Sequence, residues 1–155
     1  MNDSNNTGQK ILLFPFYTRF IGLVLILTGM IAGYLYFFGG KPVFFVTKVF
    51  ALVSAYVGTR YFVIIQTNLL DEIAAIGLLT GLVLVSFSKE KHEKEEYLAL
   101  RLKALIWAVY CSSILWILLF LSFYGYIIFM LAPMAFICFF IFYNIFFRYF
   151  LRKSI

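Results

Sequence analysis

The segment "KPVFFVTKVFALVSAYVGTRYFVIIQTN", residues 41–68, decides between a chain that crosses a membrane four times and one that crosses it five times. Lys48 and Arg60 interrupt it, so its longest uncharged run is 11 residues. A spanning helix needs about 20 mostly apolar residues, and a charge at mid-membrane costs about 3 kcal/mol or more. Val, Ile, Thr, Phe and Tyr dominate the segment, and "VGTR" is typical of a turn between two strands. We therefore expect a β-hairpin over 43–65, with a fifth transmembrane helix as the alternative.

Composition assigns the chain to a class before any motif is considered. Of its 155 residues, 64% are hydrophobic and 13% are charged, which is about half the charged fraction of an average soluble domain. A water-soluble fold would lack the polar side chains to cover its surface. We therefore expect a single integral membrane domain, 1–155. Cys111 and Cys138 both fall in apolar runs and are interpreted as small buried residues rather than as a disulfide or a zinc site.

The uncharged runs of the chain predict four membrane-spanning helices. Residues 20–40 form one such run, and residues 104–147 form a run long enough to cross twice, divided by the turn-like "FYGYI". A shorter run, 73–88, reaches spanning length when residues 69–72 are added at the interface. The expected fold is an all-α, four-helix transmembrane bundle with a short extracytoplasmic β-hairpin-like segment at 41–68. Its spans are expected at about 20–40, 69–88, 104–123 and 127–147.

The Lys and Arg residues predict the orientation of the chain. With four spans, 10 of the 13 basic residues fall on the side that holds both termini and the loop after the second span, and 3 fall on the other side. Loops rich in Lys and Arg stay in the cytoplasm. Both termini and residues 89–103 are therefore expected to be cytoplasmic. A five-helix chain would give the same split but would place the N-terminus outside.

The charged stretch "SKEKHEKEEYLALRLK", residues 88–103, is expected to be a solvated cytoplasmic helix. Residues four apart are of opposite charge in three pairs: Lys89 with Glu93, Glu90 with Lys94 and Lys91 with Glu95. The helix would begin near residue 88 and continue into the third span, with Arg101 and Lys103 reaching toward lipid phosphates. Five basic and four acidic residues leave a net charge of +1, too small for direct nucleic-acid binding.

Two roles are open for this cytoplasmic connector. It either serves only to fix the topology or forms a docking surface for a cytoplasmic or membrane protein partner. The residues of such a docking surface would be Lys89, Glu90, Lys91, Glu93, Lys94, Glu95, Arg101 and Lys103.

Three short motifs carry a resemblance to a known family. They are "NLLDEI" at 68–73, "SKEKHEKEE" at 88–96 and "LRLKAL" at 100–105. Their order resembles a family of small uncharacterised bacterial inner-membrane proteins with the approximate pattern N-x-x-D-E-I, S-K-E-K-x-E-D-E and L-R-L. The resemblance covers about residues 60–155, and Lys94 stands where that pattern usually has an acid. It implies a multi-pass protein of the bacterial inner (cytoplasmic) membrane and carries no activity over to any residue.

Two glycine motifs predict close helix packing. Gly29 and Gly33 lie four apart in the first span, and Gly77 and Gly81 lie four apart in the second. Small residues at this spacing let two membrane helices approach closely. We expect the first two spans to pack on each other through these glycines, with the seam of a homodimer or of a partner complex as the alternative.

The sequence shows no catalytic or metal-binding arrangement. Its three uncharged runs contain no Asp, Glu, His, Lys or Arg, which proton relays and transporters of charged substrates normally need. His92 is the only histidine, and "HEKEE" lacks the second histidine of a metalloprotease helix. We therefore predict no catalytic residue, no metal and no cofactor.

The remaining candidate for a polar site lies on the extracytoplasmic side. Its residues would be Lys48, Arg60, Asn68, Asp71 and Glu72. A simpler interpretation is that Asn68 caps the second span, while Asp71 and Glu72 occupy a first helical turn that favours negative charge.

Two functions are consistent with these features. The first is a non-enzymatic small membrane subunit or regulator that lies in the lipid bilayer and presents the 89–103 helix to a partner. The second is a small membrane sensor or transporter that binds a ligand near the extracytoplasmic helix ends. Copurification with a protein partner would favour the first.

Overall fold

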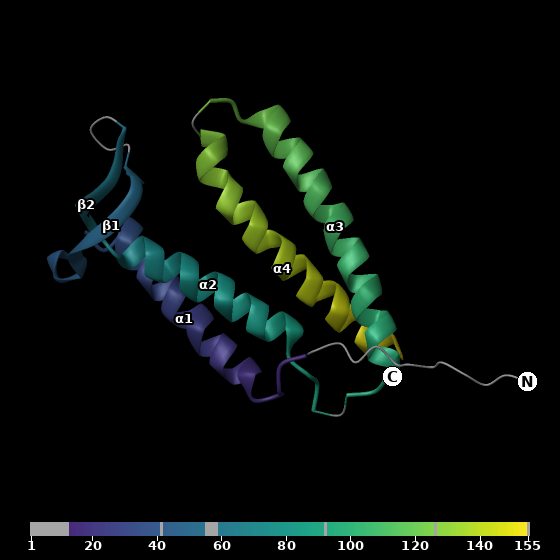
Figure 1. Ribbon diagram of the computed structural model, residues 1–155. Coiled ribbons are helices and arrows are strands. Elements are labelled where there is room, and N and C mark those ends of the chain that lie inside the picture. Colours follow the sequence, from purple (N-terminus) through teal and green to yellow (C-terminus); the bar gives the residue numbers. More distant parts are fainter. Residues whose placement is uncertain (1–12, 41, 55–58, 92, 126, 155) are drawn as a thin grey trace, which may run out of the picture.

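The computed structural model describes residues 13–40, 42–54, 59–91, 93–125 and 127–154. These residues form four helices and one two-stranded antiparallel sheet (Figure 1). In chain order the elements are α1 (Thr18–Phe37), the 3-10 turn η1 (Val43–Phe45), β1 (Val46–Ser54), β2 (Arg60–Asn68), α2 (Leu70–Phe87), α3 (Glu96–Ser122) and α4 (Ile127–Ser154). His92 lies outside the described residues.

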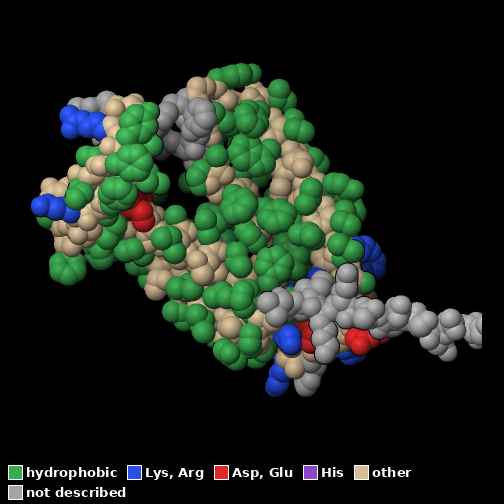
Figure 2. Space-filling view, in the orientation of Figure 1, with side chains coloured by type: hydrophobic (Ala, Val, Ile, Leu, Met, Phe, Trp, Pro, Cys, Tyr) green, Lys and Arg blue, Asp and Glu red, His purple; other side chains and the backbone are tan. Residues whose placement is uncertain are grey.

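All four helices are long and apolar enough to cross a membrane, which is the profile of a membrane protein. The 20 residues of α1 span about 30 Å, close to the thickness of a hydrocarbon core, and the 27 residues of α3 span about 40 Å. Figure 2 shows that hydrophobic side chains cover most of one face of the molecule, while charged side chains gather near the hairpin and at the opposite end of the helices. The four expected helices are confirmed.

The expected β-hairpin is also confirmed, and no fifth helix forms in the described part of residues 41–68. Strand β1 pairs with β2 in one constant register, from Val46 opposite Asn68 to Ser54 opposite Arg60. Apolar side chains lie on both faces: Phe50 and Ile64 on one face are 63% and 68% exposed, and Val53 and Tyr61 on the other are 57% and 67% exposed. An isolated two-stranded hairpin is at best marginally stable in water, and exposed apolar side chains on both faces add to this.

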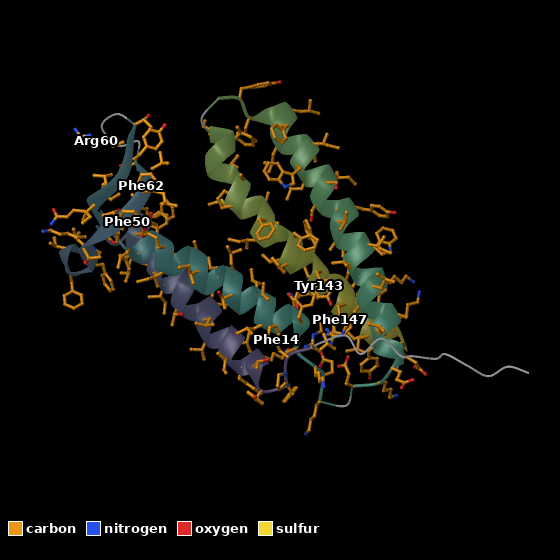
Figure 3. The ribbon with its side chains drawn as sticks, viewed as in Figure 1. Phe14, Phe50, Arg60, Phe62, Tyr143 and Phe147 are labelled. Carbon is orange, nitrogen blue, oxygen red and sulfur yellow. The ribbon has the colours of Figure 1, made fainter. Side chains whose placement is uncertain are left out.

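One position interrupts the regular hairpin. Phe62 has a φ of 51°, in the left-handed region that aromatic side chains rarely adopt, and the ladder lacks the pairing of Phe62 with Leu52. The Phe62 ring nevertheless lies beside that of Phe50, with 6.3 Å between ring centroids (Figure 3). The aromatic contact holds the two strands together at the point where the backbone is strained.

The helices are arranged as two pairs that meet near one end. Helix α1 packs along α2 and α3 packs along α4, whereas the main contact between the pairs is that of α2 with α4. Figure 1 shows the pairs close together near the C-terminus of α4 and further apart toward the hairpin. We refer to these two ends as the junction end and the hairpin end.

Glycines allow α1 and α2 to approach closely. A Cβ added to Gly29 would lie 2.8 Å from the backbone nitrogen of Leu78, and one added to Gly81 would lie 2.7 Å from the carbonyl oxygen of Gly22. Gly77 similarly faces the backbone of α1, with the Cα of Gly29 3.2 Å from its Cβ position. Glycine is therefore the residue that fits at these positions, since any side chain would separate the helices.

Helix α3 uses alanines where α1 and α2 use glycines. Ala104 and Ala108 are fully buried, and the α4 rings of Tyr143 and Phe147 pack against them (Figure 3). These two rings stack with an interplanar angle of 6°. Small residues on one helix and large rings on the other fill the space between α3 and α4.

The structure corrects the expected helix over residues 88–103. The described residues between 88 and 95 are not helical, and α3 begins only at Glu96. The predicted pairs between residues four apart are therefore not formed as helical pairs. Each such pair is worth only about 0.2–0.5 kcal/mol, and two acids of the stretch have partly buried partners instead: Glu90 binds Arg19 and Glu93 binds Arg101.

Candidate functional site

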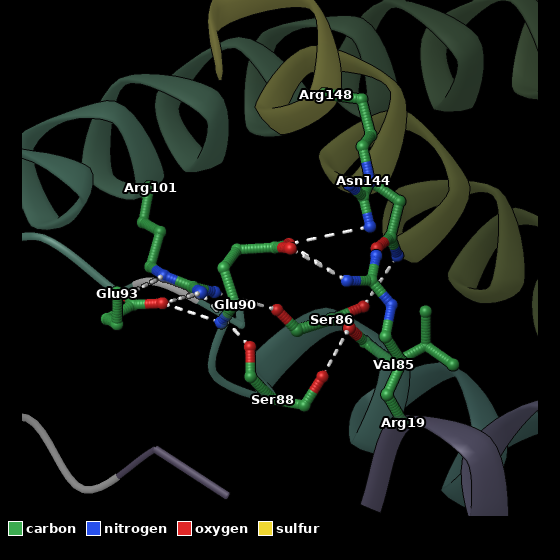
Figure 4. Close-up of polar contacts among 9 residues, drawn as sticks. All are labelled: Arg19, Val85, Ser86, Ser88, Glu90, Glu93, Arg101, Asn144 and Arg148. Carbon is green, nitrogen blue, oxygen red and sulfur yellow. Dashed lines mark hydrogen bonds and ion pairs between the residues drawn. The ribbon is translucent and has the colours of Figure 1, made fainter. Parts of the chain in front are cut away.

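The polar side chains of the junction end form the most extensive interaction network among the described residues. We call this network the polar junction (Figure 4). Its members are Arg19 of α1, Ser86 of α2, Ser88, Glu90 and Glu93 of the following loop, Arg101 of α3, and Asn144 and Arg148 of α4.

Arg101 lies at the centre of the polar junction and is only 5% exposed. Its Nη1 donates to the carbonyl of Ser86 at 3.2 Å, and its Nη2 donates to the carbonyl of Ser88 at 3.0 Å. Its Nε and Nη2 also lie 3.3 Å from the two carboxylate oxygens of Glu93. The guanidinium carbon lies 4.4 Å from the centre of the Phe147 ring. A buried cation needs this many partners, so Arg101 fixes the α2–α3 loop against both helices of the second pair.

This position of Arg101 differs from the sequence prediction. Its side chain was expected to reach lipid phosphates but turns inward instead. Lys103, two residues later, is exposed, with its Nζ 4.8 Å from the centre of the Phe150 ring. Residues two apart point to different faces of a helix, so one cation of α3 is buried and the other lies at the surface.

Glu90 connects α1 with α4. The Nη1 of Arg19 lies 2.9 Å and 3.0 Å from its two carboxylate oxygens, and the Nη2 of Arg148 lies 3.4 Å from one of them. The side chains of Arg19 and Glu90 are 16% and 15% exposed, so this pair is partly desolvated and stronger than a surface ion pair. The backbone N–H of Glu90 donates to Glu93 at 2.7 Å, which joins its ion pairs to those of Arg101.

A neutral contact links α2 directly to α4. The Nδ2 of Asn144 donates to the hydroxyl of Ser86 at 2.7 Å and to the carbonyl of Phe140 at 2.8 Å. Next to it, the Phe87 ring packs on Tyr143, with 5.5 Å between ring centroids. A hydrogen bond between membrane helices is worth about 1 kcal/mol. The Asn144–Ser86 bond and the packed rings together fix the position of α2 along α4.

The segment before α1 also contacts the junction end. The backbone N–H of Phe14 donates to the carbonyl of Phe87 at 3.0 Å, and the N–H of Lys89 donates to the carbonyl of Phe14 at 2.8 Å. These bonds occupy backbone groups at the end of α2 that would otherwise lack partners. All four helices and both segments that flank the first pair thus contribute to the same end of the molecule.

The predicted docking residues of the connector separate into two groups. Glu90, Glu93 and Arg101 are half-buried or buried and bind other residues of the chain. The others are exposed: Lys89, Lys91, Lys94, Glu95 and Lys103. The surface that remains is a non-helical loop with three lysines, not a helical face of alternating charge.

The structure separates the two cations of the predicted extracytoplasmic site. Lys48 pairs with Gln66 in the register and Arg60 is six residues from Gln66 along β2, so the two cations are separated by about 20 Å of strand. Figure 3 places Arg60 at the tip of the hairpin. Asn68 accepts a hydrogen bond from the N–H of Leu70 at 3.1 Å, although the N-cap position of α2 is Leu69, one residue later than the sequence suggests.

The two acids at the start of α2 lie beside this cap. Asp71 and Glu72 are both in the first turn of α2, as expected. Glu72 is exposed, while Asp71 is half-buried and its Oδ1 has no hydrogen-bond partner among the described residues. A helix start favours negative charge, so the two acids fit a structural role at this end.

The four predicted packing glycines are not equivalent. Gly29, Gly77 and Gly81 lie at the α1–α2 contact described above. A Cβ on Gly33 would meet only the Cβ of Ala74, at the ordinary distance of 3.7 Å. Gly22 has the closer contact, with its Cβ position 2.8 Å from the carbonyl oxygen of Gly81, and it extends the α1–α2 contact toward the junction end. We call Gly22, Gly29, Gly77 and Gly81 the glycine seam.

The described part of the chain contains no cluster of potential metal ligands. Among those residues no group of three or more His, Cys, Asp or Glu side chains comes together. Cys111 and Cys138 are both half-buried and free. The polar junction is built from ion pairs and hydrogen bonds that satisfy one another, which is the chemistry of a structural fastening.

Comparison of the chain with protein-family models, with curated proteins and with solved structures gives no match. The family resemblance of the three sequence motifs therefore stays an interpretation of the sequence. Those motifs do contain central residues of the polar junction, since Glu90 and Glu93 belong to the second motif and Arg101 to the third.

Sequence reasoning missed most of the polar junction. Arg19 and Arg148 were counted only among the 10 basic residues that predict the orientation, and Ser86 was not considered. The sequence did contain a signal for these residues. The start of the first span, the end of the second and the end of the fourth all fall on the same side of a four-span chain. Basic residues there meet the acidic residues of the connector.

Proposed function

We propose that the protein is a small, non-enzymatic membrane subunit or regulator that binds a partner protein through its transmembrane helices. The observation that carries this proposal is the divergence of the two helix pairs. They are fastened at the junction end, and their facing sides become progressively uncovered toward the hairpin end.

The facing sides can be followed residue by residue. On α2, the side that carries the buried Ser86 continues through Leu82, which is buried, to Ala75, which is exposed. On α4, the side that carries Asn144 continues from the buried Phe140 to the exposed Pro133. Both exposed stretches lie within apolar helices of spanning length. Their chemistry suits an apolar transmembrane segment of a partner that contacts α2 and α4 together.

This proposal changes the surface through which a partner would bind. The sequence favoured a charged connector helix, but three of its charged residues bind within the chain. The partner is therefore assigned to the uncovered sides of α2 and α4, and the connector loop is assigned to fastening the pairs. A second copy of this chain is one partner of suitable chemistry, since its own helices are equally apolar.

The proposed location is the bacterial inner (cytoplasmic) membrane, with both termini and the polar junction on the cytoplasmic side. The support is the charge distribution: 10 of the 13 basic residues lie on the junction side of a four-span chain. The hairpin would then lie at the extracytoplasmic surface, with its apolar side chains in contact with lipid or with the partner.

The alternative function, a ligand-binding sensor or transporter, has less support. Its proposed cations, Lys48 and Arg60, are separated by about 20 Å of strand. Asn68 is already occupied by hydrogen bonds to Pro42 and Leu70. A charged ligand would need these groups to converge.

Site-specific photocrosslinking in native membranes tests the proposal. A photoreactive residue at Ala75 should give a crosslinked protein adduct, whose mass identifies a partner or a second copy. The matched control is Ile31, which is 60% exposed but lies two residues after Gly29 and so on the opposite face of α1. Equal labelling at both positions, together with a lone monomer in mild detergent, would contradict the proposal.

A further inference from the structure

Helix α4 carries two adjoining surface pockets near the junction end. A pocket of about 450 Å³ is lined by Asn144, Ile145, Arg148, Tyr149 and Arg152. A second pocket, of about 300 Å³, is lined by Trp107, Ile145, Phe146, Tyr149 and Phe150. They share Ile145 and Tyr149, so a polar pocket and an apolar pocket lie side by side.

The sequence of α4 explains why a polar pocket and an apolar pocket adjoin. Arg148 and Arg152 are four residues apart, so both guanidinium groups project from one side of the helix. Ile145 and Tyr149 are also four apart and form the ridge between the two pockets. Trp107 of α3 closes the apolar pocket, with its ring 6.0 Å from that of Phe146.

The polar pocket has an excess of positive charge. Arg148 is 42% exposed and shares the single carboxylate of Glu90 with Arg19, which leaves one positive charge on this trio. Arg152 is exposed and adds a second. None of the residues that line the two pockets is acidic. Lys103 lies over Phe150, at the edge of the apolar pocket, and brings a third cation close by.

With α4 spanning a membrane, the site would lie at the depth of a lipid headgroup. The apolar part of α4 ends at Phe147, and its last turns contain Arg148, Arg152 and Lys153. Trp107 and Tyr149 are the ring types that gather at the boundary between hydrocarbon and water. A molecule with a negative group and an attached hydrocarbon chain would place one part in each pocket.

We propose that this pair of pockets binds an anionic phospholipid. Arg148 and Arg152 bind its phosphate, as guanidinium groups do with two parallel donors, and one acyl chain lies against Trp107 and Phe146. Basic pockets on membrane helices select anionic headgroups over zwitterionic ones, and two arginines with one shared carboxylate correspond to a preference of about tenfold. The preference does not depend on the protein partner proposed above.

Trp107 provides an internal probe for the acyl chain. The variant Trp116→Phe leaves Trp107 as the sole tryptophan, since the chain has two. In phosphatidylcholine nanodiscs, a minority of phosphatidylglycerol with brominated acyl chains should quench Trp107 far more than the same fraction of brominated phosphatidylcholine. Equal quenching by the two lipids would overturn the proposal.

Further substitutions separate the site from the fold. Arg152→Gln should abolish the preference while leaving the Arg148–Glu90 ion pair and the unfolding temperature unchanged. Lys89→Gln with Lys91→Gln removes two exposed cations of the loop and should leave the preference intact. Loss of the preference in this control, or its persistence in Arg152→Gln, would contradict a site at α4. Excess inorganic phosphate should not reverse the quenching; reversal would mean that the pocket binds a free anion.

Discussion

Arg19 and Glu90 form an ion pair between the start of α1 and the loop after α2, with 2.9 Å between Nη1 and Oε1, and the same oxygen lies 3.4 Å from Arg148 of α4. One carboxylate therefore connects the first and last helices of the chain. Helix α1 belongs to one pair and α4 belongs to the other. The other main contact between the two pairs is that of α2 with α4. The ion pairs of Glu90 and the contacts of Arg101 together explain why the pairs meet at this end.

Replacing Glu90 by Gln should destabilise the protein by about 1–2 kcal/mol, because two partly desolvated guanidinium groups lose their shared counter-ion. Glu95→Gln is the matched control, since Glu95 is an exposed acid of the same loop. Unfolding in mild detergent measures both variants. Equal stability of the two would show that the ion pairs of Glu90 do not fasten the helices.

Replacing Arg101 by Gln should cost more, about 2–4 kcal/mol, because it leaves two buried carbonyl groups and the Glu93 carboxylate without their donor. Arg101→Lys should recover only part of this loss, since an ammonium group cannot reach all the acceptors that the planar guanidinium binds. Lys94→Gln, at an exposed position of the loop, should be neutral within about 0.5 kcal/mol. An Arg101→Gln protein as stable as Lys94→Gln would contradict the central role of Arg101.

The glycine seam predicts different outcomes at positions of similar sequence. Gly29→Ala should destabilise the α1–α2 pair by about 1–3 kcal/mol, because its Cβ would lie 2.8 Å from the backbone of Leu78. Gly33→Ala should be nearly neutral, because its Cβ would meet that of Ala74 at 3.7 Å. Thermal unfolding of the two variants in the same detergent gives the comparison. Equal effects would contradict the described packing of α1 on α2.

Four spans predict that both ends of the chain lie on one side of the membrane. In a variant without Cys111 and Cys138, cysteines introduced at residue 5 and at Ser154 should both be protected from an impermeant thiol reagent in intact cells. A cysteine at Thr59, at the tip of the hairpin, should be labelled. Labelling at residue 5 with protection at Ser154 would require an odd number of spans.

Much of this fold could be predicted from the sequence, because membrane spans and hairpins depend on local chemistry. Uncharged runs give the helices, and the β-branched and aromatic residues of 41–68, interrupted by two charges, give the strands. The glycine motifs, which are also local patterns of sequence, predict the α1–α2 contact. Each of these signals lies within about 30 residues of sequence.

The polar junction could not be predicted in this way because its partners are far apart in the chain. Glu90 binds Arg19 across 71 residues, whereas the sequence suggested Lys94, four residues away. A helical pair with Lys94 would be exposed and worth a few tenths of a kcal/mol, while the pair with Arg19 is partly desolvated. Tertiary contacts therefore override the local helical pattern of residues 88–95.

The most direct test of the proposed arrangement is a pair of distances between α2 and α4. The two helices run in the same direction, so Val83 and Ile141 lie three residues before the Ser86–Asn144 contact, while Ile76 and Met134 lie ten residues before it. Spin labels on each pair, in nanodiscs without a partner, give both distances by electron resonance. We predict a clearly longer distance for residues 76 and 134 than for residues 83 and 141. Equal distances, as in helices packed about 8–10 Å apart along their whole length, would contradict the fastened and diverging pairs.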